Sequence, residues 1–138
     1  MAGFTASKEL GCLLKKVQHE LRRLMDQSLR EIELTTPQYS LLSELAEYPG
    51  ISNAELARKC FVTAQTMNLI VQSLESRGLI TREPKPDHGR ILTTVLTEEG
   101  QTLLKAATVR VLEIEKNLFP NLTGSELREL SRLLSKIT

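Results

Sequence analysis

The chain has 138 residues, the length of one domain or of a small core with a helical extension. Its 41% hydrophobic and 25% charged residues exclude disordered and fibrous proteins, and a net charge of +1 does not by itself indicate a nucleic-acid binder. No segment stays apolar over the roughly 18 residues of a membrane span, so we expect a cytosolic protein with no membrane partner.

Helical periodicity dominates the first third of the chain. From Ser7, a candidate N-cap, apolar residues recur at spacings of three and four, which predicts one long helix over residues 7–33. Its apolar stripe is longer than one small core can cover, and its members are Leu10, Leu14, Val17, Leu21, Leu24 and Ile32. A second helix should begin with Thr36 as its cap and Pro37 at its first position, and end before Gly50.

Two short helices should follow, joined by a very short link. Ser52 and Glu55 have the spacing of a capping box, which opens a third helix over about residues 53–59. Residues 60–62 form the link to a fourth helix that Thr63 caps and that ends before Gly78, where a C′ glycine belongs. Two helices with such a link are typical of a helix-turn-helix.

The remainder of the chain is predicted to contain a hairpin and two more helices. Strands over residues 79–83 and 91–96 should enclose a wide loop with one glycine and two prolines. Thr97 opens a fifth helix, and Thr123 with Glu126 forms the capping box of a sixth. A hairpin directly after a helix-turn-helix is expected to be a wing.

The outer face of the predicted fourth helix points to DNA. The apolar stripe of this helix comprises Ala64, Met67, Ile70, Val71 and Leu74, with Leu69 near its margin. The opposite face carries Gln65, Thr66, Asn68, Gln72 and Ser73. Amides can pair with adenine N6 and N7 in the major groove, whereas a lysine-rich face would bind phosphates without distinguishing sequences. The alternative is a solvated helix that is merely low in charge.

The predicted wing carries Lys85, His88, Gly89 and Arg90. Glycine lets the backbone approach DNA closely, and arginine suits a narrow, electronegative minor groove. The alternative is an exposed turn with ordinary charges, which we would favour for an isolated hairpin but not for one that follows a helix-turn-helix.

The stretch from Leu34 to Gly100 resembles the MarR family of transcriptional regulators. The matching motifs are Leu-Thr-x-Pro-Gln at residues 34–38, Thr-x-Gln-Thr-Met at 63–67, Glu-x-x-Gly-Leu-Ile at 75–80 and Leu-Thr-x-x-Gly at 96–100. The resemblance implies a mainly α fold with a small β-hairpin wing in a single chain, 1–138. It also implies a winged helix-turn-helix lobe (36–96) and dimerisation helices (7–33 and 98–138).

The same resemblance implies a homodimer on a pseudo-palindromic site in double-stranded DNA. Its candidate contacts are Ser52, Asn53, Thr63, Ala64, Gln65, Thr66, Asn68, Gln72, Lys85, His88, Gly89 and Arg90. Asp87 would hold Arg90, although the two stand three residues apart where the commoner family pattern has two. Ligand or oxidant control would act through a cleft between the lobe and the dimerisation helices.

The candidate effector-binding residues are Cys12, His19 and Tyr39. Some relatives sense oxidants through a cysteine near the position of Cys12, but here it adjoins the apolar stripe, and we favour a buried structural role for it and for Cys60. A surface histidine and a packed tyrosine are the favoured interpretations of His19 and Tyr39.

We therefore predict a DNA-binding repressor released by a small aromatic or phenolic effector. A thiol-based redox-sensing repressor of the same fold and a winged-helix protein-interaction module are the alternatives. An enzyme using a cysteine with a histidine is disfavoured, because no acid is placed to orient the histidine and no Gly-rich phosphate loop exists. The cysteines match no metal-ligand spacing, and we predict neither a metal nor a cofactor.

Overall fold

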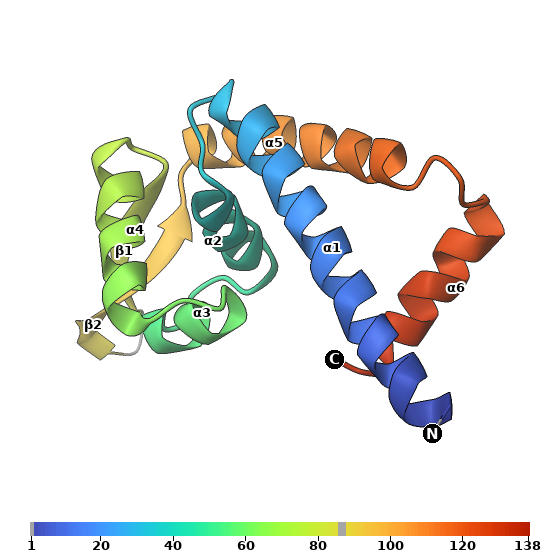
Figure 1. The fold of residues 1–138 in the computed structure, drawn as a ribbon. Helices are drawn as coiled ribbons and strands as arrows, with labels where there is room; N and C mark the ends of the chain where they lie inside the picture. The colour runs from blue at the N-terminus through green and yellow to red at the C-terminus, as the bar shows by residue number, and fades with distance from the viewer. Residues whose placement is uncertain (1, 86–87) are drawn as a thin grey trace.

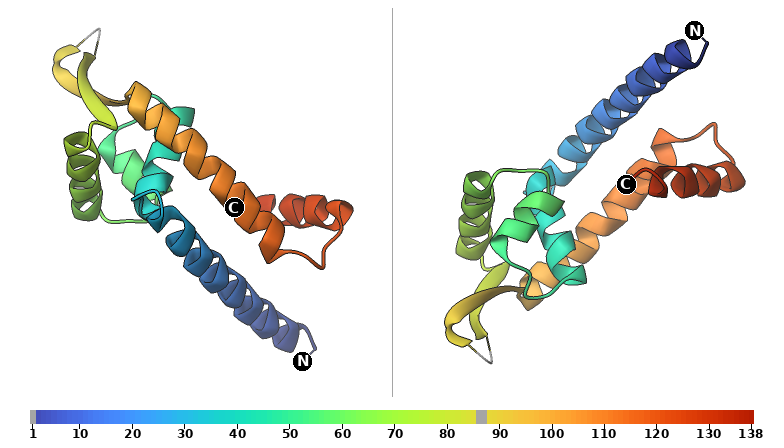
Figure 2. Two further views of the ribbon diagram at one scale, coloured as in Figure 1. Left: turned by 90° about the horizontal axis from the view of Figure 1, so that it is seen from above. Right: turned by 90° about the horizontal axis from the view of Figure 1, so that it is seen from below.

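The computed structural model describes the backbone of residues 2–85 and 88–138, and the side chains of residues 9–84 and 93–138. The described residues form helices α1 (Ala2–Arg30), α2 (Thr36–Glu47), α3 (Asn53–Lys59), α4 (Ala64–Ser76), α5 (Glu98–Leu118) and α6 (Gly124–Ser135), and strands β1 (Ile80–Lys85) and β2 (His88–Leu96). Helices α2 to α4 and the hairpin form a lobe, from which α5 leads away (Figure 1). Helix α6 lies at the far end of α5 (Figure 2). The predicted fold class, a mainly helical winged helix-turn-helix, is confirmed.

Two predicted helix starts are wrong. Helix α1 begins at Ala2 and not at Ser7, because serine inside a helix costs only a few tenths of a kcal/mol, roughly, and does not force a boundary. The cap of α2 is Thr35 and not Thr36. The Thr35 hydroxyl accepts from the Gln38 N–H (3.2 Å) while the Gln38 side chain accepts from the Thr35 N–H (3.0 Å), so the position of Gln38 decides the cap.

The other predicted caps are in place. The hydroxyls of Thr63, Thr97 and Thr123 each accept the backbone N–H three residues on, and Thr123 with Glu126 completes a capping box. The box predicted at Ser52 is half formed: its hydroxyl accepts from the Glu55 N–H at 3.2 Å, but the Glu55 carboxylate lies 3.4 Å from an Arg58 nitrogen. Each such cap stabilises its helix by about 1 kcal/mol.

The hairpin is longer than predicted. Its antiparallel register runs from Ile80 opposite Leu96 to Pro84 opposite Leu92, then shifts so that Lys85 pairs with His88. The prediction of a wide loop between the strands is therefore wrong, since both strands extend towards the tip. Proline is compatible with β1 because a two-stranded sheet consists of edge strands, where a missing N–H can face solvent.

The core lies inside the lobe and against the adjoining ends of α1 and α5. Its fully buried large side chains are Leu29, Leu41, Leu42, Leu45, Leu56, Met67, Val71, Leu74 and Ile80. The N-terminal part of the α1 stripe lies outside this core, and Leu10, Leu14 and Val17 are exposed in the single chain. The expectation that the stripe exceeds one small core is thus confirmed.

The lobe is joined tightly to the start of α5. Gly78 ends α4 with a φ of +75°, and its carbonyl accepts from the Thr97 hydroxyl at 2.6 Å. The Thr97 N–H donates to the Leu79 carbonyl at 3.1 Å. Gly100 is buried at this joint, where an added Cβ would lie 2.0 Å from the Leu79 carbonyl oxygen. Only glycine allows the two backbones to approach this closely.

Candidate nucleic-acid interface

Helix α4 lies on the side of the lobe that faces away from α1 (Figure 1). A tight turn sets this position: Cys60 ends α3, and Phe61 follows with a φ of +57° and 94% of its side chain exposed. Thr63 then caps α4. The turn directs the apolar stripe of α4 into the core and leaves the opposite face open.

The predicted stripe of α4 is confirmed at four of its five positions. Met67, Ile70, Val71 and Leu74 are buried, whereas Ala64 is exposed because it is the first residue of the helix and lies beyond the core. Leu69 is not at the margin of the stripe. At 3.6 residues per turn it lies about 150° around the helix from the centre of the stripe, and 62% of it is exposed.

The polar face of α4 points outward as predicted. Gln65, Thr66, Asn68, Gln72 and Ser73 are all exposed. No side chain from Ala64 to Leu74 carries a charge. This surface is therefore rich in hydrogen-bonding groups, and it has no preference for positively or negatively charged partners.

Hydrogen bonds hold the two flanks of this face. The Thr63 hydroxyl donates to that of Thr66 at 3.0 Å, and the Asn53 amide donates to Asn68 Oδ1 at 3.4 Å. On the other flank, the Gln38 amide of α2 donates to Ser73 Oγ at 3.2 Å. The structure thus brings the predicted contacts from α3 and α4 together on one surface. Ser52 is exposed beside them, with its hydroxyl engaged in capping α3.

The predicted wing residues lie at the distal end of the hairpin. Lys85 ends β1, and residues 88–90 begin β2. Their side chains lie outside the described residues, and Asp87 lies outside them altogether, so a contact between Asp87 and Arg90 stays a prediction. The base of the hairpin is tied to α4, because Arg82 lies 3.5 Å from the Glu75 carboxylate.

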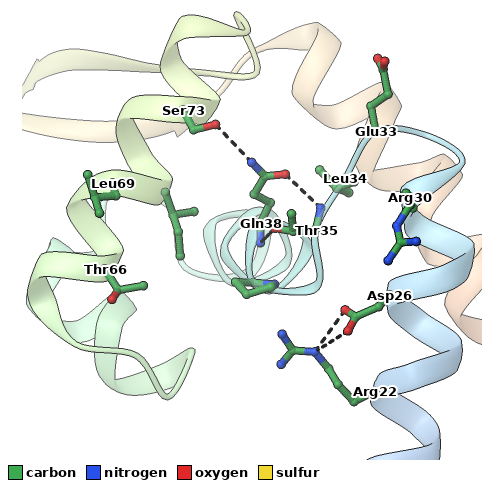
Figure 3. A pocket seen from close by; sticks show the side chains of 12 residues that line it. Arg22, Asp26, Arg30, Glu33, Leu34, Thr35, Gln38, Thr66, Leu69 and Ser73 are labelled. Atoms are coloured by element: carbon green, nitrogen blue, oxygen red, sulfur yellow. Dashed lines mark hydrogen bonds and ion pairs between the residues drawn. The ribbon is translucent and has the colours of Figure 1, made fainter.

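A cavity of about 640 Å³ lies over the start of α2, between α4 and α1 (Figure 3). Its lining residues are Arg22, Asp26, Arg30, Glu33, Leu34, Thr35, Pro37, Gln38, Thr66, Leu69, Ile70 and Ser73. Its charged groups come mainly from α1, and its apolar groups come mainly from α2 and α4. The cavity therefore lies between the polar face of α4 and the long helix α1.

A carboxylate organises the α1 wall of this cavity. Asp26 accepts hydrogen bonds from the buried Thr36 hydroxyl and from Arg22 Nε, which lies 3.1 Å away. The Thr36 hydrogen bond, followed by the charges of Arg22 and Arg30, lowers the pKa of Asp26. The carboxylate is thus ionised at neutral pH and anchors α2 to α1.

The predicted effector-binding residues do not line this cavity. Cys12 is exposed, so its predicted burial is wrong in the single chain, because it lies on the part of α1 that extends beyond the core. His19 lies on the α1 surface in a separate, shallow depression of about 480 Å³. Tyr39 is half-buried and packs against the core, as favoured. The spacing of Arg22, Asp26 and Arg30, four residues apart on one helical face, could have indicated the cavity wall.

Cys60 is half-buried against the core, as expected for a structural cysteine. Burial, with a smaller contribution from the charge of Glu44, raises the pKa of its thiol to about 11. The reactive thiolate is therefore scarce at neutral pH.

Comparison with known proteins connects this geometry to a family. A MarR family model matches residues 32–91. The HTH-type transcriptional repressor Rv2887 of Mycobacterium tuberculosis is 36% identical over 135 residues, which cover 98% of this chain and 97% of the repressor. The chain belongs to the MarR family. The transcriptional regulator HosA of Escherichia coli is a further relative, 30% identical over 91% of this chain and 96% of its own length.

Solved structures agree with the assignment of this chain to the MarR family. The Rv2887 complex with salicylic acid has a TM-score of 0.82 at 36% identity, covering 94% of this chain and 96% of that one. The Rv2887 complex with DNA has a TM-score of 0.80 at 35% identity, covering 93% and 96%. A mutant MarR from E. coli with operator DNA has a TM-score of 0.81 at 26% identity, covering 97% and 96%. The chain is thus a MarR-type transcriptional repressor with a winged-helix DNA-binding lobe.

Among the described residues, none of the helices is both long enough and apolar enough to cross a membrane. Within the same residues, no three His, Cys, Asp or Glu side chains gather as metal ligands.

Proposed function

We propose that this chain acts as a homodimeric, sequence-specific repressor that a small aromatic acid or phenol releases from its operator. Two copies of α4 would enter successive major grooves, about 10 base pairs apart, and the hairpins would reach the flanking minor grooves. The operator would be pseudo-palindromic, because a two-fold-symmetric dimer presents the same surface to each half-site.

The observation that carries this proposal is the uncharged polar face of α4. Gln65 and Gln72 project from it, while hydrogen bonds with residues of neighbouring elements orient Asn68 and Ser73. Amides of this kind can pair bidentately with adenine N6 and N7, and each such pair discriminates by about 1–3 kcal/mol. Lys85 and Arg90 on the hairpin would supply phosphate and minor-groove contacts.

Exposed apolar side chains support dimerisation. None of the residues of α6 is buried in the single chain, although Leu133 and Leu134 are apolar, and Ile137 just beyond the helix is exposed as well. Leu10, Leu14 and Val17 of α1 and Leu112 of α5 are likewise exposed. A second copy that covers these helices would remove this apolar surface from water, at about 25 cal/mol per Å² buried.

The cavity between α1, α2 and α4 supports control by a small molecule. Its volume of about 640 Å³ lies within the ordinary range for ligand pockets. Arg22 and Arg30 offer positive charge for a carboxylate or phenolate, and Leu34, Leu69 and Ile70 offer apolar surface for a ring. Rv2887 has been crystallised with salicylic acid and with p-aminosalicylic acid, ligands of this chemistry. A ligand here would contact α4 and bias its position relative to α1.

Selection of bound sequences from random duplexes tests the proposal. The recovered pool should converge on inverted half-sites, and Gln65→Ala should relax the preference at specific base pairs. A pool with no sequence preference would contradict the proposal and favour the protein-interaction module.

Release by effector can be tested with salicylate as the probe. Salicylate should weaken operator binding, and Arg30→Gln should raise the concentration required without altering binding in its absence. A ligand response that is unchanged in Arg30→Gln and in Arg22→Gln would remove the cavity from the proposal.

A further inference from the structure

Leu69 occupies the centre of the outward face of α4. Gln65 and Thr66 precede it by four and three residues, and Gln72 and Ser73 follow it by three and four, so these four polar residues surround it on the helix surface. Although leucine is apolar, 62% of Leu69 is exposed, whereas Met67, Ile70 and Val71 beside it in sequence are buried.

A single exposed leucine is common on protein surfaces and needs no explanation by itself. Leu69 is different because of its location. It lies within the surface formed by Gln65 and Gln72 on α4, and α4 is far from α6 (Figure 1), where dimer contacts are proposed. When this face enters a major groove, Leu69 must leave water together with the amides around it.

The major groove offers one apolar group to such a side chain, the 5-methyl group of thymine. The other groups on the base edges are hydrogen-bond donors and acceptors, which a leucine would desolvate without compensation. A leucine at the centre of this face thus favours thymine and disfavours base pairs that present a polar group at the same place.

We propose that Leu69 is a specificity-determining residue that packs on the 5-methyl group of a thymine in each half-site. The inference rests on the proposed DNA-binding function and deepens it. Side chains four residues apart on a helix lie about 5–6 Å from each other, and bases along one strand are about 3.4 Å apart. The thymine contacted by Leu69 should therefore lie within about two base pairs of the adenine paired with Gln65, which predicts an A·T-rich half-site.

Leu69 also lines the α4 wall of the cavity, on the opposite side from Arg22 and Arg30 (Figure 3). An effector in the cavity could contact the same side chain. The test therefore measures DNA binding with no effector present, so that an altered ligand response does not enter the result.

Replacing thymine by deoxyuridine provides the test, because it removes the methyl group and leaves the O4 acceptor. Each thymine of the selected operator is replaced in turn, and affinity is measured for the wild-type dimer and for Leu69→Ala. Burial of one methyl-sized group corresponds to about fourfold in affinity. One thymine per half-site should show this loss with the wild type and no loss with Leu69→Ala.

Two controls define the result. Ser76→Ala, at the C-terminal end of α4, should keep the wild-type dependence on that methyl group. At the same position, 5-methylcytosine should bind the wild type better than cytosine, and Leu69→Ala should not distinguish them. Because Leu69 is exposed, Leu69→Ala should unfold at the wild-type temperature.

The outcomes separate this inference from the function on which it depends. If operator binding requires Gln65 but every deoxyuridine substitution affects the wild type and Leu69→Ala equally, the thymine contact is wrong and the repressor proposal stands. If the wild type shows no preference among duplexes, the proposed function and the thymine contact both fail.

Discussion

At the scale of single residues, Gln65 and Asn68 should both discriminate between DNA sequences. They differ in how far the structure orients their side chains before DNA binds. Asn68 accepts from Asn53 at 3.4 Å, so its amide is oriented before DNA binds. We expect Gln65→Ala and Asn68→Ala each to lose about 1–3 kcal/mol of binding on the selected operator while binding to random duplexes barely changes. Fluorescence anisotropy with both duplexes measures this, and Gln101→Ala on the α5 surface is the control. Equal losses of binding free energy on the two duplexes would indicate that these side chains contact phosphates and not bases.

Cys60 should be an unreactive thiol. Its pKa of about 11, against an ordinary value of 9.0, leaves about 100-fold less thiolate at neutral pH than an unperturbed cysteine has. We expect iodoacetamide to alkylate Cys60 of the folded protein far more slowly than Cys60 of the protein in denaturant, with a rate that rises up to about pH 11. Mass spectrometry of the labelled peptide follows the reaction. Comparable rates in the two states would show that the fold does not suppress the reactivity of this thiol.

The polar face of α4 could be predicted from the sequence, whereas the cavity could not. The orientation of Gln65 and Gln72 follows from the helical period once Met67 and Val71 are assigned to the core. The cavity requires the distance between α1 and α4, which the position of α2 between them determines. The prediction that Leu69 lies near the margin of the buried stripe follows its apolar character and is wrong. The helical period alone places it on the face opposite the stripe, and 62% of it is exposed.

At the scale of secondary-structure elements, the contact between α1 and α2 should respond to acid. The folded state lowers the pKa of Asp26, so it binds fewer protons than the unfolded chain, in which aspartate has a pKa of about 3.9. The stabilisation is fully present above that value and is lost as pH falls through the lowered pKa of the folded state. We expect Asp26→Asn to be less stable than the wild type at pH 6, and this difference to shrink below about pH 4.

The size of this effect is limited by solvent. Because the Asp26 side chain is 41% exposed, its pairing with Arg22 should contribute less than about 1 kcal/mol. Urea unfolding at several pH values and one fixed protein concentration measures it. A difference between the two proteins that stays constant from pH 6 to pH 2.5 would contradict the assignment to Asp26.

The hairpin should contribute a charge-dependent part of operator binding. If Arg90 enters a minor groove, Arg90→Ala should weaken binding and lower the slope of log affinity against log salt by about one unit. The loss should be larger where the flanking sequence is A/T-rich, because a narrow groove has a more negative potential. Arg90→Lys should recover only part of the lost affinity, since the lysine ammonium group is more strongly hydrated than the guanidinium group. Wild-type affinity and salt dependence in Arg90→Ala would leave recognition to α4 alone.

Three helix starts could be predicted from a single threonine cap, whereas the start of α2 could not, because two residues compete for the cap. Thr63, Thr97 and Thr123 each precede a helix without a rival, and each caps it. At the start of α2, two adjacent threonines compete, and the choice depends on Gln38 and on the tertiary contact from Thr36 to Asp26. The hairpin was predicted too short because strand pairing beyond Pro84 depends on the partner strand.

At the scale of the whole molecule, the protein should be a dimer. Apolar side chains of α1, α5 and α6 are exposed in one chain, and so is Ile137 beyond α6, which is 73% exposed. We expect a single dimeric species by sedimentation at micromolar concentration, and Leu134→Glu should dissociate or unfold it because a buried, unpaired carboxylate is costly. Glu47→Gln on the lobe surface is the control. A folded wild-type monomer under these conditions would remove the basis for an inverted-repeat operator.

The backbone contact between Gly100 and Leu79 has a consequence for inheritance. A side chain at position 100 must displace the start of α5 from the end of α4, so the lobe would be misplaced while the distant surfaces that we propose for dimerisation stay intact. Such a subunit would still pair with a normal one. Each mixed pair would present only one correctly placed α4 to a two-part operator, and its affinity would fall with the loss of bivalency. In a cell that carries both alleles, we expect Gly100→Val to be dominant over the wild type, whereas a substitution that abolishes folding should be recessive.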